Sequence, residues 1–431
     1  MEHRKKLGFW SIVLLGINGI IGSGIFLLPN QAAALMGPLS IAVILFDAIL
    51  VLSLTLCFAE AGGMFRKNGG PYVYSREAFG SFIGFEVGFM KWAIGIIAWA
   101  AMAAAFSTAL GVVWEPAKEG IVKNIVVTVI IVWLGAINYL GVSVSKLLNN
   151  VITIAKLVPL LLFVAVGIFF IHGNSFTPVL PHGTYKHGAF GAAALLIFYA
   201  FTGFESLAVA AEDMKNPEKN IPKAIIMVIF ICSLFYVLIQ TVAEGTLGPK
   251  LAVSQAPLAQ ATQHFIGHAG ATIILAGTLI SIAGINIAAS FITPRSAVAL
   301  ANDGLIPSFL AKNSRFGTPA WAIFFTVLFA LPLALSGSFA QLAAISVVSR
   351  FAQYLPTCLS IIVLRKKRSD LTRTFKVPFG PVIPILAVIV SIWLLTQAST
   401  QQLIWGLCGL AAGIPVYFLM KLTRMKKKMA D

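Results

Sequence analysis

"NGIIGSGIF", residues 18–26, lies in the middle of an apolar run that covers residues 9–35. Three glycines and one serine stand within these nine positions. Each glycine in a helix interior costs roughly 1 kcal/mol relative to alanine. A continuous membrane helix has no reason to gather its weakest helix formers at its midpoint. We therefore predict that the helix stops in this stretch and starts again.

The composition indicates a protein that crosses a membrane many times. Of 431 residues, 58% are hydrophobic and 11% are charged, and the mean hydropathy is +0.91. About 20 apolar residues cross a bilayer as a helix, and the first run, which lacks a small-residue cleavage site, is expected to stay as a span. We predict twelve spans, near 9–35, 39–64, 83–113, 121–141, 150–171, 188–213, 223–246, 270–301, 320–336, 341–364, 380–398 and 401–420.

The net charge of +16 follows the positive-inside rule rather than indicating a nucleic-acid partner. If both termini are cytoplasmic, 23 lysines and arginines fall in cytoplasmic segments. Only four fall in the outer loops: Lys118, Lys123, Lys186 and Lys250. We expect a multi-pass protein of the cytoplasmic membrane with both ends inside. Its basic tail over residues 421–431 suits an anionic inner leaflet.

A second interruption lies in "LIFYAFTGFESLAVAAEDMKNP" (196–217), where Gly203 follows Thr202 inside the sixth run. Five spans separate the two interruptions, and because five is odd the second set must be inverted relative to the first. Paired, glycine-interrupted spans indicate an inverted-repeat transporter. The predicted organisation is a tail (1–8), two five-span repeats (9–171 and 188–364), two further spans (380–420) and a basic tail (421–431).

The interruptions offer complementary backbone groups. Free N–H groups near Ser23, Gly24 and Ile25, at the positive end of a half-helix, suit a carboxylate. Free carbonyls suit an ammonium group; the expected ones are near Ile20, Ile21, Phe198, Tyr199 and Phe201. Together they match an amino acid zwitterion, with glycine where the main chain is approached closely. The alternative is that the glycines serve helix packing alone.

Five blocks, taken in order, resemble the amino acid–polyamine–organocation superfamily, and within it bacterial permeases related to the light subunits of heteromeric amino acid transporters. They are "NGIIGSGIFLLP" (18–29), "FAEAGGMFRKNGGPYVYSREAFG" (58–80), "FYAFTGFESLAVAAEDMKNPEKNIPKAI" (198–225), "TPRSAVALANDGLIP" (293–307) and "LRKKRSDLTRTFKVPFGPVIPILAV" (364–388).

The resemblance implies an all-helical, leucine-transporter-type fold with a 5+5 inverted repeat, broken first and sixth helices and two extra helices. It implies secondary transport of amino acids by alternating access, without a cofactor. It places the substrate carboxylate on Gly22, Ser23, Gly24 and Ile25. The ammonium would lie on the carbonyls of Ile20, Ile21, Phe198, Tyr199 and Phe201, beside Thr202 and Gly203.

Ionisable groups inside the spans are functional hypotheses because they are costly there. Lys156 lies well inside the fifth run, and in related sodium-independent permeases the matching lysine occupies the place of a sodium ion. We expect it to couple transport to protons or to permit exchange. Glu205 follows the second interruption and could accept hydrogen bonds from the freed backbone or sense pH near the site; in similar permeases this glutamate is a gating or packing element. Tyr236 could reach Lys156 or the site.

Other side chains are candidates for the pocket and for ion pairs. Tyr199 and Phe201 could roof the substrate, with Phe201 as an outer gate, and Thr202, Asn286 and Ser290 could line the side-chain pocket. Asp47, Lys91 and Arg350 depart from their apolar runs, and we expect pairing among them or with another charge. An ion pair or inner gate is likewise expected of Arg295 and Asp303.

No metal site is predicted. The four cysteines fall inside spans without ligand spacing, and His264 with His268, four residues apart, fits a surface helix better than a metal site. Lacking a deep cluster of His, Asp or Glu and a repeated polar filter, the sequence disfavours a membrane enzyme and a channel. An amino acid/amine antiporter or a polyamine transporter remains an alternative. Small neutral or apolar amino acids are favoured as substrates.

Overall fold

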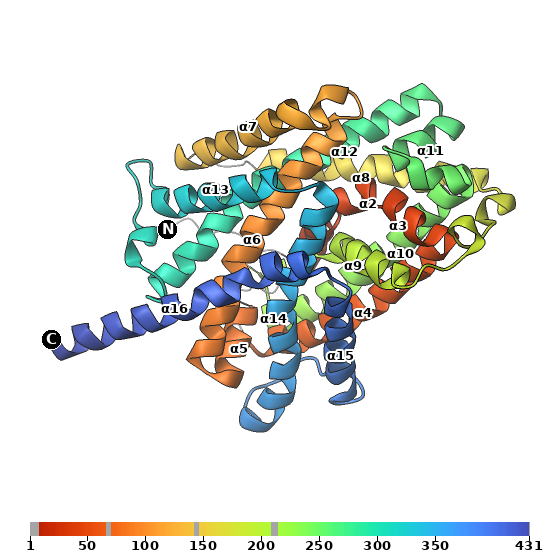
Figure 1. Ribbon diagram of the computed structural model, residues 1–431. Coiled ribbons are helices and arrows are strands. Elements are labelled where there is room, and N and C mark those ends of the chain that lie inside the picture. The colour runs from red at the N-terminus through yellow and green to blue at the C-terminus, as the bar shows by residue number, and fades with distance from the viewer. Residues whose placement is uncertain (1–7, 66–69, 142–145, 208–213, 431) are drawn as a thin grey trace. The chain divides into compact units, whose positions relative to one another are not determined.

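The computed structural model describes residues 8–65, 70–141, 146–207 and 214–430, and within these ranges it contains helices and no strand (Figure 1). The charges predicted at residues 1–7 and 66–69 lie outside them. The α-helices are α1 (Phe9–Ile20), α2 (Ser23–Leu27), α3 (Pro29–Met36), α4 (Ser40–Met64), α5 (Pro71–Phe79), α6 (Ser81–Leu110), α7 (Gly120–Tyr139), α8 (Lys146–Gly167), α9 (Ala189–Phe198), α10 (Pro217–Leu247), α11 (Pro257–Phe265), α12 (His268–Asn302), α13 (Ala320–Leu335), α14 (Phe339–Lys367), α15 (Val382–Thr396) and α16 (Thr400–Ala430).

The apolar runs of the sequence lie on these helices. Among the described residues, eight helical segments are long and apolar enough to cross a membrane. Four shorter apolar helices accompany them, at Phe9–Ile20, Ile154–Phe170, Ala320–Leu335 and Val382–Thr396. The first of these is short because α1 ends at the predicted interruption.

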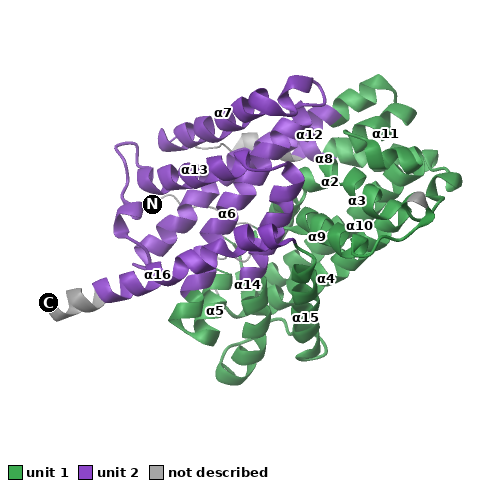
Figure 2. Cartoon of the chain, in the orientation of Figure 1, with its two compact units in different colours: residues 1–84, 158–274, 353–398 green, residues 85–157, 275–352, 399–431 purple. Residues whose placement is uncertain are grey.

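The chain divides into two compact units, each drawn from both predicted repeats (Figure 2). Unit 1 comprises residues 1–84, 158–274 and 353–398, and unit 2 comprises residues 85–157, 275–352 and 399–431. Unit 1 therefore holds α1–α5, α9–α11 and α15. Unit 2 holds α7, α13, α16 and most of α6 and α12. The boundary divides α8 and α14 near their middles.

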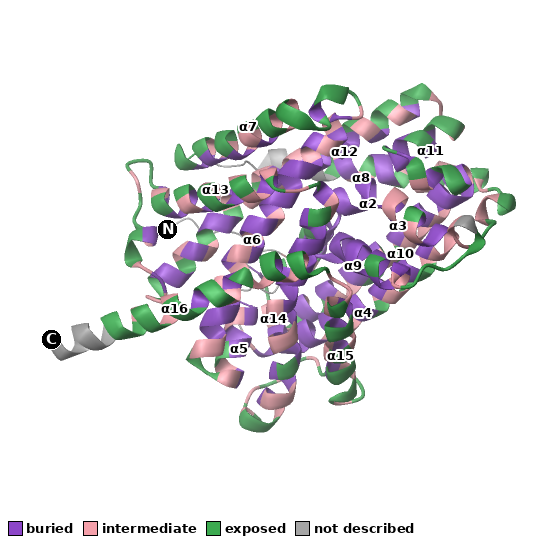
Figure 3. Ribbon diagram, viewed as in Figure 1, coloured by how far each residue is buried: buried purple, intermediate pink, exposed green. Residues whose placement is uncertain are grey.

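In unit 1, α4 packs along α10, and α1, α9 and α15 pack around this pair. Aromatic rings fill the space between them. The ring of Phe204 lies 5.3 Å from that of Phe58 and 5.3 Å from that of Tyr354. These three rings are fully buried, and buried residues cluster on the same helices in Figure 3. The core of unit 1 thus encloses the segment that follows α9.

Unit 2 has its own apolar core, in which α7 packs against α13. Trp92 and Trp99 of α6 belong to this core together with Val127 and Ile131 of α7. The indole N–H of Trp92 donates to Thr326 Oγ1 of α13 at 3.0 Å. A tryptophan N–H needs such a partner when it is buried. The polar contact therefore fixes the position of α6 on α13.

A buried carboxylate ties α4 to the end of α14 in unit 1. Glu60 has no exposed surface and receives two hydrogen bonds from Arg365, Nε to Oε1 at 2.8 Å and Nη2 to Oε2 at 2.5 Å. The backbone N–H of Val377 donates to Oε2 at 2.7 Å, and Arg373 Nε lies 3.8 Å from Oε1. The bidentate geometry and the extra donors satisfy a charge that burial alone would penalise.

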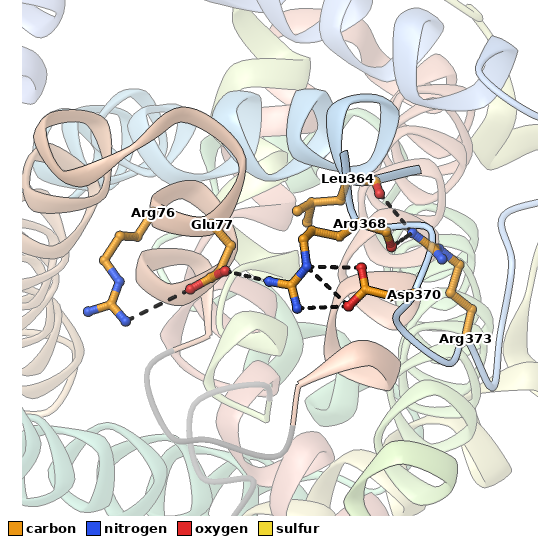
Figure 4. A network of polar contacts seen from close by, with 6 residues as sticks. All are labelled: Arg76, Glu77, Leu364, Arg368, Asp370 and Arg373. Carbon is orange, nitrogen blue, oxygen red and sulfur yellow. Dashed lines mark hydrogen bonds and ion pairs between the residues drawn. The ribbon is translucent and has the colours of Figure 1, made fainter. Parts of the chain in front are cut away.

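A second polar network continues from this clamp along the loop after α14 (Figure 4). Arg368 donates to Glu77 of α5 at 2.9 Å and to Asp370 at 3.1 Å. Arg373 holds the carbonyl oxygens of Leu364 and Arg368, at 2.9 and 3.0 Å. The Arg368 guanidinium also lowers the pKa of the Asp370 carboxyl from its ordinary value. The loop is thus bound to α5 as well as to α4.

We predict that Glu60→Gln destabilises the fold by about 3 kcal/mol, because it leaves Arg365 and Arg373 without a counter-charge in a mostly buried place. Thermal unfolding of the purified protein in detergent measures the effect. Asp370→Asn is the matched control, since that side chain is 64% exposed and surface ion pairs contribute little. Equal melting temperatures for Glu60→Gln and wild type would contradict the clamp.

Candidate functional site

The first helix is interrupted where the sequence predicts. α1 ends at Ile20 and α2 starts at Ser23. Ile21 adopts an extended conformation (φ −68°, ψ 102°), and so does Gly22 (φ −136°, ψ −150°). Two extended residues break the ladder of helical hydrogen bonds, so backbone groups on both sides need other partners. α2 is only five residues long, and α3 begins directly after Leu28.

The second interruption follows α9. The chain forms a 3-10 turn, η6 (Tyr199–Phe201), then Thr202 is extended (ψ 151°) and Gly203 has φ +116°. A further 3-10 turn, η7 (Phe204–Ser206), comes next. Both the N–H and the hydroxyl of Thr202 donate to the Tyr199 carbonyl, at 3.1 and 2.8 Å. A side-chain cap and a left-handed glycine together end the helix here.

The two interruptions lie against each other within unit 1. A Cβ atom on Gly203 would overlap the carbonyl oxygen of Gly19. A Cβ atom on Gly24 would stand 2.8 Å from the Cα atom of Ala200. At both positions only glycine allows the two main chains to approach this closely. The glycines therefore bring main chain against main chain at the interruptions themselves.

Tyr236 of α10 bridges the two interruptions. Its hydroxyl lies 2.9 Å from the Ala200 carbonyl oxygen and 3.3 Å from the Ile20 carbonyl oxygen. Its ring packs edge-on against Phe201, with centroids 5.1 Å apart. The Tyr236 hydroxyl thus faces two carbonyl groups, one at each interruption. Of the alternatives raised by the sequence, Tyr236 reaches the interruptions.

Glu205 accepts a hydrogen bond from the freed backbone, as predicted. The N–H of Gly203 donates to Glu205 Oε2 at 2.9 Å. Tyr354 of α14 donates its hydroxyl to the same oxygen at 3.0 Å, and Gln353 approaches Oε1 at 3.5 Å. The carboxylate is buried and joins the second interruption to α14. Glu205 therefore holds the shape of the interruption.

The predicted ligand residues are brought together, and their backbone groups differ in availability. Tyr199 O already accepts two hydrogen bonds from Thr202, and Ile20 O faces Tyr236. Gly203 is half-buried, whereas the others are buried: Ile20, Ile21, Gly22, Ser23, Gly24, Ile25, Phe198, Tyr199, Phe201 and Thr202. The Thr202 hydroxyl donates to the Tyr199 carbonyl of its own turn and so acts as a cap there; its place in a pocket stays a prediction.

Three predicted residues belong to unit 2 and not to the unit that holds the interruptions. Lys156 is fully buried in the first part of α8. Asn286 donates to the carbonyls of Met102 and Ile282, at 2.9 and 3.0 Å. Ser290 donates to the Ile287 carbonyl at 2.7 Å. The hydroxyl of Ser290 and the amide N–H groups of Asn286 thus have partners within unit 2.

Among the residues that the structure describes, neither the buried Asp47 nor the exposed Arg295 forms an ion pair of the kind expected. Neither carboxylate oxygen of Asp47 has a hydrogen-bond partner among the described residues, although the side chain is fully buried in α4. Arg295 donates to the carbonyl of Phe291 and approaches the side-chain oxygen of Asn138 at 3.5 Å. Lys91 and Arg350 belong to unit 2, whereas Asp47 belongs to unit 1.

Sequence reasoning missed three contributors to this site. The Ala200 carbonyl is a backbone group with no sequence signal of its own. Gln353 and Tyr354 lie in a helix that also carries other polar side chains, such as Gln341, Ser346 and Arg350, so the sequence alone does not single them out. Their contact with Glu205 depends on packing between residues about 150 positions apart, which a local pattern does not reveal.

Comparisons with known proteins find amino acid permeases and other transporters. Residues 7–414 match the family described as amino acid permease. The chain is 30% identical to the branched-chain amino acid permease BcaP of Bacillus subtilis, over 96% of this chain and 93% of that one. The methylthioribose transporter of the same organism is 30% identical, with coverages of 96% and 93%. Its serine/threonine exchanger SteT is 29% identical, with 97% of each chain covered.

We predict that Gly203→Ala lowers the melting temperature strongly. The left-handed conformation costs a residue with a side chain about 1–2 kcal/mol, and the new Cβ would overlap the Gly19 carbonyl. Gly173→Ala is the matched control, since that glycine has an ordinary φ and a Cβ added to it would meet no atom within 4 Å. Unchanged unfolding of both variants would show that the two main chains do not meet at Gly203.

Proposed function

This chain belongs to the amino acid permease family, and on that premise we propose that it carries amino acids across the cytoplasmic membrane by alternating access. Its named relatives are transporters rather than enzymes. The observation that carries the proposal is the close approach of the two interrupted helices, main chain against main chain, at Gly24, Ala200 and Gly203.

We propose twelve spans, of which ten form a 5+5 inverted repeat and two follow it. Eight long and four shorter apolar helices in the described ranges support the count. The composition of the units supports the repeat. Unit 1 contains the first and second spans of each half, and unit 2 contains the third and fourth. The fifth span of each half, α8 or α14, begins in unit 2 and ends in unit 1.

The substrate would bind by its two charged ends. We place its carboxylate at the N–H groups that open α2, near Ser23, Gly24 and Ile25, where the helix dipole favours an anion. Its ammonium would face the carbonyls around Ile21 and Phe198. Because the Tyr199 carbonyl already accepts two hydrogen bonds, it contributes least to that end.

The rest of the substrate would determine selectivity. Phe201, packed on Tyr236, is the proposed outer gate, and Asn286 and Ser290 remain candidates for the pocket. Small neutral or apolar amino acids fit the lack of a charged side chain among these residues. The substrates in the names of two relatives, branched-chain amino acids and serine or threonine, fall in the same class; methylthioribose does not.

We propose that transport is independent of sodium and is coupled to protons or to exchange. Lys156 carries this part of the proposal because it is fully buried, and its ammonium group would take the place of a bound sodium ion. The charge distribution supports an orientation with both termini cytoplasmic.

Uptake into proteoliposomes tests the function. We expect accumulation of neutral amino acids without sodium, driven by a proton gradient or by internal amino acid. Lys156→Ala is expected to abolish accumulation, whereas Lys156→Arg keeps the charge and retains part of it. The panel includes methylthioribose and the decarboxylated amines. Uptake of no amino acid under any condition would reject the proposal, and a strict sodium requirement would reject the role of Lys156.

Tyr236→Phe is expected to weaken uptake at low substrate concentration by about three- to tenfold, the usual worth of one hydrogen bond. The ring stays in place against Phe201, so the change reports the hydroxyl alone. Initial rates over a substrate series separate KM from the maximal rate. Tyr185→Phe, an exposed loop residue, is the control. A kinetic profile equal to wild type would contradict the bridging role.

A further inference from the structure

α10 presents three buried polar side chains at intervals of four residues: Tyr236, Gln240 and Glu244, each 1% exposed. Residues four apart lie on the same face of a helix. All three lie in unit 1 (Figure 2). The series starts at the hydroxyl that bridges the two interruptions and ends at a carboxyl group in the last turn of α10. A row of buried polar side chains along a membrane helix is energetically costly, and such a row is therefore a functional hypothesis.

The carboxyl group of Glu244 is held by neutral donors. The Ser40 hydroxyl, at the start of α4, donates to Glu244 Oε1 at 3.1 Å. Gln240 Nε2 donates to Ser40 Oγ at 2.9 Å and lies 3.5 Å from Glu244 Oε1. Hydrogen bonds therefore run from Gln240 through Ser40 to the acid.

No positive charge compensates Glu244 in the part of the chain that the structure describes. On the elements packed against this end of α10, the titratable groups are His172 before η4 (Gly173–Phe176), Lys250 of η9 (Gly248–Val253), His264 of α11 and Asp47 of α4. The first three are exposed, and none of the four bonds to Glu244. The carboxyl also sits at the C-terminal, negative end of its helix. A charged carboxylate there is unfavourable, and a bound proton removes that charge.

The same hydrogen bonds lead to the first interrupted helix. Gln240 Nε2 also lies 3.3 Å from the carbonyl oxygen of Pro29, the first residue of α3, close to the end of α2. Gln240 Oε1 has no hydrogen-bond partner among the described residues. One amide group thus connects the acid, the start of α4 and the segment that continues from the proposed carboxylate site.

We propose that Glu244 is a proton-binding site whose occupancy acts on α2 and α3 through Gln240. When the carboxylate takes up a proton, its new O–H needs an acceptor, and a half-turn of the Gln240 amide supplies Oε1. That turn withdraws the Nε2 donor from Pro29. Loss of the proton restores the arrangement. The role of Glu244 in coupling rests on the proposed transport function. The binding of a proton by Glu244 does not.

Infrared spectroscopy of the purified protein tests proton binding without any substrate. Between about pH 8 and about pH 5, around the range where protein carboxyl groups titrate when perturbed, wild type is expected to show a carboxylic C=O band that Glu244→Gln lacks. Asp47→Asn is the matched control, a second fully buried acid in unit 1. Its removal should leave the Glu244 band in place. Spectra of Glu244→Gln that superimpose on wild type would overturn the proposal.

Transport assays test the coupling. Glu244→Gln is expected to lose the dependence of uptake on external pH while it keeps exchange of labelled for unlabelled amino acid, which moves no net proton. Ser40→Ala is expected to shift the pH profile without flattening it. A pH profile equal to wild type would overturn the coupling role. If wild type transports no amino acid, the proposed function fails, and the infrared result still decides whether Glu244 binds a proton.

Discussion

A backbone that leaves its helix inside a membrane has no water to bond to, so the protein must supply partners for the freed groups. Unit 1 is organised around that constraint. Thr202 caps the Tyr199 carbonyl, Glu205 accepts the Gly203 N–H, and Tyr236 faces the carbonyls of Ile20 and Ala200. Each partner arises from a different part of the chain or from the turn itself. The interruptions are therefore fixed, preorganised features, as a binding site made of backbone requires.

Much of the helical framework was predictable because apolar runs of about 20 residues and glycine placement have strong physical causes. The stop at Ile20 and the break near Gly203 follow from residues that the helix cannot use well. The five-residue length of α2 was not predicted, and the close approach of Gly24 to Ala200 depends on the fold. Division into two units that mix both halves is likewise a tertiary property. Nothing local in the sequence specifies it.

In the site as well, contacts between neighbours in the chain could be predicted, whereas contacts that depend on the tertiary fold could not. Glu205 could be assigned to the freed backbone because it stands two residues from Gly203 in the chain. Its second partner, Tyr354, is 149 positions away and needed the fold. The Thr202 hydroxyl donates to its own turn, a local hydrogen bond that threonine readily makes, and its predicted place in the pocket stays untested. The roles of Lys156, Asn286 and Ser290 remain proposals.

The clamp at Glu60 has a consequence for how the chain is made. Its partner Arg365 is 305 residues further along, so a ribosome must make every helix from α5 to α14 before the counter-charge exists. Until then the carboxylate cannot occupy its native place without a large penalty. The end of α4 that carries Glu60 therefore reaches its final packing only late in biogenesis. A chain cut short before Arg365 lacks the side chain that compensates Glu60.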